Sequence, residues 1–243
     1  MTLIDLSSRH VYETYMSTKG TPMAQHDTVD RLRASLERRA RRRSSMPAPQ
    51  VLVVAPGVEL ESGGSQPFHT ASIGKVMTAT LVAMLEEQGR LGYDSPLGAV
   101  LPASDLVGLP AAPGVEVASD VTVEHLLTHT SGLPDFFEPP RGTRTAVSTR
   151  SVAAQPNRYW SPTELLDEVR TLPADGRPGE RFRYSDTVMV LLGRILEEAT
   201  GEPFNGLLRK RIFEPSGMER SSTPYSDART PADLSGIDVA PFW

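Results

Sequence analysis

Residues 68–91 read FHTASIGKVMTATLVAMLEEQGRL, and this stretch decides the fold. From residue 73 to residue 85 nearly every face of a helix would be apolar, a pattern typical of a helix buried in a core. Gly89 then provides a stop signal, because glycine readily adopts the left-handed conformation that ends many helices. The sequence therefore predicts a buried helix that begins near Ser72.

The same stretch contains a serine and a lysine with the spacing S-x-x-K, at Ser72 and Lys75. Residues three apart on a helix face the same way, so the lysine amine can reach the serine hydroxyl. A serine hydroxyl is a poor nucleophile until a base takes its proton, and burial favours the neutral, basic form of a lysine. The alternative is that Lys75 extends out of a helix that is less buried than the pattern indicates.

The tripeptide Tyr184-Ser185-Asp186 precedes a second apolar helix over residues 187–200. A tyrosine close to a lysine can act as a proton shuttle, which would make Tyr184 a partner of the serine and lysine. The simpler interpretation is that Asp186 caps the helix that follows it.

Two histidines, His125 and His129, are four residues apart, a spacing that can hold a metal ion. The glutamate of zinc-protease helices is absent between them, and no third ligand is evident. We therefore expect no metal site, and we expect His129 to be hydrogen-bonded within a turn. No phosphate-binding or dinucleotide-binding glycine pattern is present either, so no cofactor is expected.

Turn and capping signals divide the rest of the chain into short elements. We expect a helix that ends in the basic cluster at residues 37–43, followed by strands at residues 50–55 and 58–61. We also expect short helices capped by Thr122 and Ser161. Residues 91–113 and 134–161 are expected to be mostly irregular loops. One hairpin is a marginal sheet on its own, so further strands are expected elsewhere.

The composition argues against nucleic-acid-binding, membrane-spanning and thiol-dependent functions. A net charge of −5 gives no reason to expect nucleic acid, and the basic cluster at residues 37–43 is explained as a solvated helix end. No run of apolar residues is long enough to cross a membrane, and the first residues do not resemble a secretory signal, so we expect a cytoplasmic location. The chain has no cysteine, which excludes disulfides and thiolate chemistry.

Three stretches in order resemble the serine β-lactamase-like superfamily, which includes class C β-lactamases, D-alanyl-D-alanine carboxypeptidases and related esterases. They are residues 68–91, the stretch VTVEHLLTHTSGLPDF at residues 121–136, and GERFRYSDTVMVLLGRILEEATGEPF at residues 179–204, with a shorter echo in IFEPSGM at residues 212–218. The resemblance implies an α+β fold: an antiparallel sheet flanked by helices, beside a mostly helical subdomain, with the active site between the two.

The resemblance also implies roles for individual residues. Ser72 would be acylated by an ester, amide or peptide carbonyl, and its backbone N–H would be one oxyanion donor. Lys75 would help to remove the serine proton, and Tyr184 would protonate the leaving group and activate the deacylating water. These roles imply a small-molecule ester, amide or peptide substrate, and the composition gives no reason to expect a membrane or nucleic-acid partner.

Two departures from the family pattern bear on activity. Asp186 stands where the family has an asparagine, and a carboxylate cannot donate to a substrate carbonyl but can pair with Lys75 and raise its pKa. The family's later element, a lysine or histidine followed by a small residue and a glycine, is absent. After Tyr184 the only lysine is Lys210, which does not fit this pattern, and there is no histidine. We therefore expect esterase-like more than β-lactamase-like chemistry, and alternatively a non-catalytic member that binds a ligand or partner in the same cleft.

The absent element and the missing strands lead us to expect a C-terminally incomplete domain over residues 1–243, with the site completed by a further segment or a second chain. Within it, residues 1–90 would hold the N-terminal helix, the strands and the nucleophile helix. Residues 91–218 would form the helical subdomain, and residues 219–243 would return toward the sheet.

Overall fold

The computed structural model describes residues 29–38, 50–56, 58–62, 68–155 and 158–223. The chain divides into two compact units. The first comprises residues 1–71, 216–221 and 236–243, and the second comprises residues 72–215 and 222–235. The division falls immediately before Ser72, so helix α2 (Gly74–Glu87) groups with the helical unit, whereas the sequence analysis grouped it with the strands. The predicted single domain over residues 1–243 stays a prediction.

In its described residues, the first unit contains the sheet and one helix. A helix covers residues 29–38, while most of the basic cluster at residues 37–43 lies outside the described residues. Strands β1 (Val51–Ala55) and β2 (Val58–Ser62) pair antiparallel, with Val53 opposite Leu60. Both predicted strands are confirmed to within one residue. In the described part of the chain the sheet has two strands, which fits an α+β class with an incomplete sheet.

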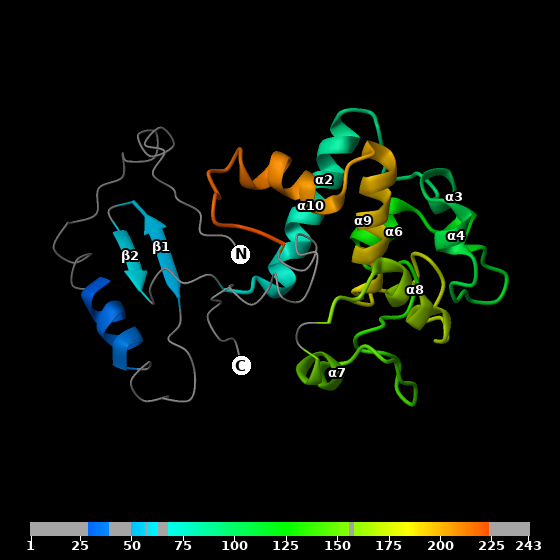
Figure 1. Ribbon diagram of the computed structural model, residues 1–243, viewed down its shortest axis with the longest axis horizontal. Helices are drawn as coiled ribbons and strands as arrows, with labels where there is room; N and C mark the ends of the chain where they lie inside the picture. The colour runs from blue at the N-terminus through cyan, green and yellow to red at the C-terminus, as the bar shows by residue number, and fades with distance from the viewer. Residues whose placement is uncertain (1–28, 39–49, 57, 63–67, 156–157, 224–243) are drawn as a thin grey trace. The chain divides into compact units, whose positions relative to one another are not determined.

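The second unit is helical (Figure 1). Its elements are α2 (Gly74–Glu87), α3 (Leu97–Val100), α4 (Ala103–Leu106), α5 (Val117–Asp120), α6 (Val123–Leu127), α7 (Thr149–Ala154), α8 (Pro162–Arg170), α9 (Thr187–Thr200), α10 (Phe204–Leu208) and a π-helical turn over Arg209–Phe213. Among the helices described, none is both long and apolar enough to cross a bilayer.

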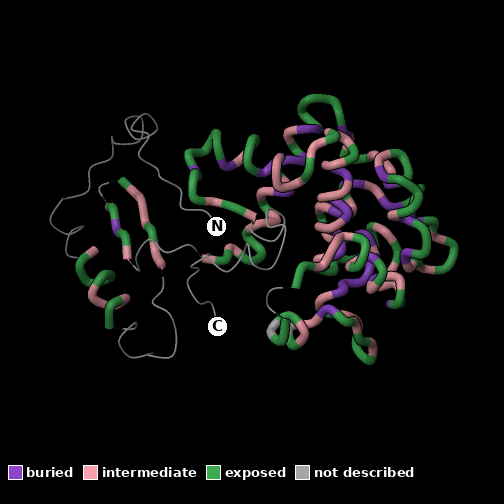
Figure 2. The backbone as a smooth tube through the Cα atoms, in the orientation of Figure 1, coloured by how far each residue is buried: buried purple, intermediate pink, exposed green. Residues whose placement is uncertain are grey.

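Helix α9 is the centre of this unit, and it contacts α2, α6, α8 and α10. Its buried residues recur at helical spacing on a wide face: Val188, Leu191, Leu192, Ile195 and Leu196. Figure 2 shows buried residues gathered along α9 and the segments beside it. The helix ends at Thr200, as the sequence predicted. Gly201 follows it in the left-handed conformation, with φ 71°.

Helix α2 differs from the prediction of a helix buried on every face. Its buried residues lie on one side, at Thr78, Leu81, Val82 and Leu85, because α9 and α10 cover that side. On the other side Val76 is 65% exposed, so the apolar pattern did not mean burial all round.

The end of α2 follows the predicted stop signal. Gly89 has φ 67°, its N–H donates to Glu86 O at 2.8 Å, and the next N–H, of Arg90, donates to Leu85 O at 2.9 Å. This pair of bonds is the Schellman arrangement that satisfies the last carbonyls of a helix.

The predicted helix starts at Thr122 and Ser161 are confirmed. Each side chain accepts a hydrogen bond from the N–H three residues later, at 3.3 Å in both helices. A third start of this kind, at Ser148, opens α7 inside the segment predicted to be irregular. Residues 91–113, also predicted to be mostly loop, contain α3 and α4. These helices are four to six residues long, too short to give a periodic apolar pattern.

Candidate active site

The first turn of α2 carries the predicted nucleophile. A short 3₁₀ turn over residues 71–73 leads directly into the helix, so Ser72 and Lys75 lie on one helical face. The Lys75 Nζ donates to Ser72 Oγ at 3.3 Å. N–H groups in a first helical turn lack intrahelical partners, which leaves the backbone there able to bind an anion.

Tyr184 completes the contacts of the serine from a distant part of the chain. Its hydroxyl donates to Ser72 Oγ at 2.8 Å, and Lys75 Nζ lies 4.8 Å from the centre of its ring. The Asp186 carboxylate forms an ion pair with Lys75. The structure therefore brings together all four residues that the sequence singled out: Lys75 and Tyr184 contact the Ser72 hydroxyl, and Asp186 contacts Lys75.

The ion pair decides the charge of the lysine. Burial by itself lowers the pKa of Lys75, but hydrogen bonds and charge interactions with Asp186 and Tyr184 outweigh burial and raise that pKa above its ordinary value. Lys75 is therefore an ammonium at neutral pH. This is the effect expected of a carboxylate in place of the family's amide, and it opposes a role for the lysine as a free base.

Asp186 does not cap α9 in the way the simpler interpretation required. It occupies the N-cap position, but with helical φ and ψ of −75° and −23°, and its side chain accepts no backbone hydrogen bond there. The carboxylate turns to Lys75 instead. Lys75 likewise does not extend into solvent, since its side chain is only 20% exposed.

The turn at residues 129–135 binds the segment that carries Tyr184. Backbone bonds join the two: Gly179 N–H donates to Thr130 O at 2.8 Å, and Arg183 N–H donates to His129 O at 2.7 Å. Gly132 has φ 75°, and a Cβ at this position would overlap Gly176 O. Glycine is required there because the two backbones approach so closely.

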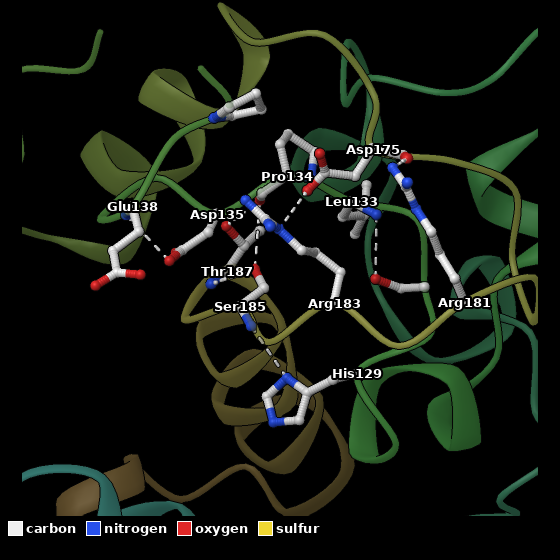
Figure 3. A network of polar contacts seen from close by, with 12 residues as sticks. His129, Leu133, Pro134, Asp135, Glu138, Asp175, Arg181, Arg183, Ser185 and Thr187 are labelled. Atoms are coloured by element: carbon white, nitrogen blue, oxygen red, sulfur yellow. Dashed lines mark hydrogen bonds and ion pairs between the residues drawn. The ribbon is translucent and has the colours of Figure 1, made fainter. Parts of the chain in front are cut away.

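Side chains and carbonyls of the turn at residues 129–135 bind the residues after Tyr184 (Figure 3). His129 Nδ1 accepts the Ser185 N–H at 3.2 Å, and Asp135 Oδ1 accepts the Asp186 N–H at 3.1 Å. Pro134 O accepts the Thr187 hydroxyl at 2.7 Å. Three successive residues are thus fixed from one turn.

The two histidines bind different backbone N–H groups. His125 Nδ1 accepts the Thr122 N–H at 3.1 Å and so caps α6. His129 makes its bond to Ser185 across 56 residues rather than within a turn, which corrects the prediction. In the described residues no group of three or more histidines and acids could hold a metal ion.

Asp135 is the residue that sequence reasoning missed. It is only 3% exposed, and besides Asp186 its carboxylate accepts the N–H groups of Phe137 and Glu138, each at 3.1 Å. Burial raises the pKa of Asp135, and its three backbone donors partly offset that rise. The signal was an acid inside the apolar run LPDFF, since a buried carboxylate needs hydrogen-bond donors.

Comparisons with known proteins agree on one family. A family model described as Beta-lactamase matches residues 34–241. Penicillin-binding protein 4 of Amycolatopsis lactamdurans is 33% identical over 161 residues, covering 66% of this chain and 37% of the relative. Esterase EstB of Burkholderia gladioli is 29% identical over 177 residues, covering 67% and 42%.

Among solved structures, a D-stereospecific amidohydrolase from Streptomyces superimposes with a TM-score of 0.54 at 25% identity. The alignment covers 65% of this chain and 46% of that protein. The chain spans about two fifths of the length of the curated relatives it matches, 37% and 42%. The matched region includes Ser72, Lys75 and Tyr184, because all three lie within residues 34–241.

Proposed function

We propose that this chain, which belongs to the Beta-lactamase family, carries the acylation site of a serine hydrolase that acts on ester or amide carbonyls through Ser72. The observation that carries the proposal is that Ser72 Oγ receives hydrogen bonds from both Lys75 Nζ, at 3.3 Å, and Tyr184 OH, at 2.8 Å. A nucleophile, a group that can move its proton and a cation that stabilises the developing charge are the parts that such a reaction needs.

The first half of the reaction forms an acyl-enzyme. Ser72 Oγ bonds to the substrate carbonyl carbon while its proton passes to the Tyr184 oxygen, and the hydroxyl proton of Tyr184 passes on to the leaving group. The Lys75 ammonium stabilises the negative charge in this step, and the Ser72 N–H donates to the carbonyl oxygen. The carbonyl re-forms as the protonated alkoxide or amine departs.

The second half releases the acid. A proton of the attacking water passes to the Tyr184 oxygen as the water oxygen bonds to the acyl carbon, and the hydroxyl proton of Tyr184 passes to Ser72 Oγ when its bond to carbon breaks. The lysine keeps its charge throughout, in keeping with the raised pKa of Lys75. In this scheme Tyr184 is the proton carrier and Lys75 is the electrostatic partner.

We propose that esters are preferred over β-lactams. Asp186 offers only acceptor oxygens where an amide would donate a hydrogen bond to a substrate carbonyl, and it is already paired with Lys75. Ester hydrolysis depends less on that donor, since an alkoxide leaves more readily than an amine. The relatives named as an esterase and an amidohydrolase support this range of carbonyl substrates.

The test is covalent labelling of the full-length protein by a fluorophosphonate, read by intact mass and peptide mapping. We expect one adduct on Ser72 that disappears in Ser72→Ala. Ser104→Ala is the matched control, because Ser104 is also exposed in the first turn of a helix. An adduct that persists in Ser72→Ala, or none in the wild type, would contradict the proposal.

A second candidate is a binding function without turnover, which the Lys75–Asp186 ion pair favours because it keeps the lysine charged. The two candidates differ with one probe. Binding of ampicillin that is equally strong in Ser72→Ala and leaves no adduct in the wild type would support the binding function.

A further inference from the structure

We propose that His129 is a positioning residue for Tyr184, and that it holds the tyrosine in place as a neutral imidazole with its proton on Nε2. The inference rests on the proposed role of Tyr184 as proton carrier. It assigns to the turn at residues 129–135 a part in the reaction that goes beyond support of the fold.

Three contacts make His129 the immediate neighbour of Tyr184. The two rings are stacked, with centroids 4.7 Å apart and planes 28° from parallel. The backbone on either side of the tyrosine bonds to the same histidine: Arg183 N–H donates to its carbonyl at 2.7 Å, and Ser185 N–H donates to its Nδ1 at 3.2 Å. One residue therefore fixes both the ring of Tyr184 and the chain that carries it.

The position suits histidine for two reasons. Its φ is 56°, in the left-handed region, where histidine, asparagine and aspartate are enriched among non-glycine residues. Its ring also packs edge-on against Phe182, with centroids 5.8 Å apart and an interplanar angle of 72°. The imidazole is thereby held between two aromatic side chains.

The hydrogen bond from Ser185 fixes the protonation state. Nδ1 accepts a backbone N–H, so a neutral imidazole must carry its proton on Nε2. Protonation of Nδ1 would set two donors against each other at Ser185, which is fully buried and has no water to replace the lost acceptor. A charged His129 is therefore incompatible with the observed arrangement of the tyrosine.

The charged groups around His129 come from three segments. Lys75 approaches from α2, Asp186 from the start of α9, and Asp135 from the same turn as the histidine, while the nearby Arg183 guanidinium pairs with Asp175. Burial and the Lys75 ammonium lower the pKa of His129 below its ordinary value of 6.5, and the two carboxylates only partly oppose this. The neutral state thus persists to lower pH in the folded protein than in the unfolded chain.

Because the pKa of His129 is lowered in the folded protein, acid should destabilise the folded state. Above pH 6.5 the histidine is neutral in both states, and as the pH falls below that value the unfolded chain binds a proton first. Both the free energy of unfolding and the reactivity of Ser72 should therefore decrease as the pH falls into this range. The loss of reactivity should follow the titration of His129.

Two measurements test the inference on the full-length protein. The rate of fluorophosphonate labelling of Ser72 is measured from pH 4.5 to 8, and the His129 and Tyr184 rings are followed by NMR over the same range. In the wild type we expect a signal for Nδ1 without a proton, a Tyr184 ring shift that follows the His129 titration, and a labelling rate that falls with it.

Two variants separate the contacts. His129→Asn keeps an acceptor for Ser185 N–H and tolerates the left-handed backbone, but it has no ring and does not titrate. We expect about 10-fold slower labelling at pH 7.5, without the decrease that follows His129. His129→Phe keeps a stacked ring and loses the acceptor, for which we expect labelling about 100-fold slower.

His125→Asn is the matched control, because His125 Nδ1 also accepts a backbone N–H, that of Thr122, which lies outside the segment that carries Tyr184. It should leave the rate and its pH profile unchanged. The inference is overturned if His129→Asn keeps the acid decrease of the wild type, which would then belong to Asp135 or another group, or if Nδ1 carries the proton.

Failure of the proposed function gives a different result. If Ser72 is labelled at no pH, the hydrolase proposal fails, and the NMR measurement still decides the inference. A Tyr184 ring shift that follows the His129 titration and is lost in His129→Asn supports the positioning contact. A Tyr184 ring that keeps its wild-type shifts in that variant overturns it.

Discussion

The two helix starts that meet at the site are held in different ways. The start of α9 is bound by the turn at residues 129–135 through side-chain and backbone hydrogen bonds, and Ser185, Thr187 and Val188 are fully buried. The start of α2 has no side-chain cap, and its Ile73 and Val76 are 63% and 65% exposed. One start is fixed by the surrounding fold, and the other has few contacts outside the site.

Because the two helix starts are held differently, substitutions near α9 should mainly affect stability, and substitutions at the start of α2 should mainly affect reactivity. Tyr184 and Asp186 are placed by packing that the whole helical unit shares, so changes beneath them should lower the free energy of unfolding. Ser72 is placed mainly by Lys75 and Tyr184, so changes there should alter reactivity and leave stability nearly intact. Four substitutions test this separation.

Lys75→Met should have the largest effect, and only on reactivity. Removing the ammonium takes away the stabilisation of developing charge, so labelling of Ser72 by a fluorophosphonate should slow by about 10²- to 10⁴-fold. The melting temperature should change little, since the flexible methionine side chain can pack in place of the lysine stem.

Lys210→Met is the matched control for this lysine, because it removes an exposed ion pair with Glu202 elsewhere in the helical unit. Its labelling rate should equal that of the wild type. A large loss of stability in Lys75→Met would show that the start of α2 is not independent of the fold.

Gly132→Ala should give the largest loss of stability. An added Cβ would overlap Gly176 O and would stand on a left-handed backbone of φ 75°, so we expect a loss of about 3 kcal/mol or more in the free energy of unfolding. Chemical denaturation followed by circular dichroism measures it. Gly114→Ala has nearly the same φ, 73°, with nothing within 4 Å of the new Cβ, and should cost about 1 kcal/mol. Equal losses in the two variants would mean that the close approach of the backbones is unimportant.

Asp135→Asn should lower stability by about 1–3 kcal/mol, because the amide nitrogen would face a buried N–H donor that the carboxylate now satisfies. Asp120→Asn is the comparison at the surface, where the carboxylate accepts the Glu116 N–H at 2.9 Å. That exposed variant should lose less than about 1 kcal/mol, since water can replace the acceptor. Thermal denaturation of both variants at pH 7 measures the difference, and equal losses would contradict a special role for the buried acid.

Asp186→Asn should have the smallest effect, and in the opposite direction. Loss of the carboxylate removes the counter-ion of the Lys75 ammonium, so more of its positive charge should act on the negative charge that develops at Ser72. We expect labelling of Ser72 to become about 10-fold faster, one factor of ten being about 1.4 kcal/mol. Asp167→Asn, which breaks an exposed ion pair with Arg170, should leave the rate unchanged. Slower labelling in Asp186→Asn would show that the ion pair assists the reaction.

The parts of the molecule with strong local signals were predictable from the sequence. The end of α2 at Gly89, the caps at Thr122 and Ser161, and the whole of α9 agree with their patterns, because glycine, serine, threonine and long apolar repeats act within a few residues. The contact between Ser72 and Lys75 was expected from their spacing, whereas the role of Tyr184 rested mainly on family resemblance.

What the sequence could not show depends on contacts between distant residues. Nothing near His129 indicates that its ring nitrogen binds a backbone 56 residues away. The apolar pattern of α2 likewise could not show that Val76 is exposed, since burial depends on what packs against the helix. The short helix α7 was missed because a single turn and a half gives no period to detect.

The hydrogen bond between Ser72 and Tyr184 joins residues 112 positions apart, and this separation has a consequence for folding. Bringing together the ends of so long a loop costs about 4 kcal/mol in chain entropy, which contacts formed along the way must offset. The packing of α2 against α9 closes the same loop, so we expect it to supply most of that offset. Chains in which these two helices have not packed would contain the serine and its lysine but not the tyrosine.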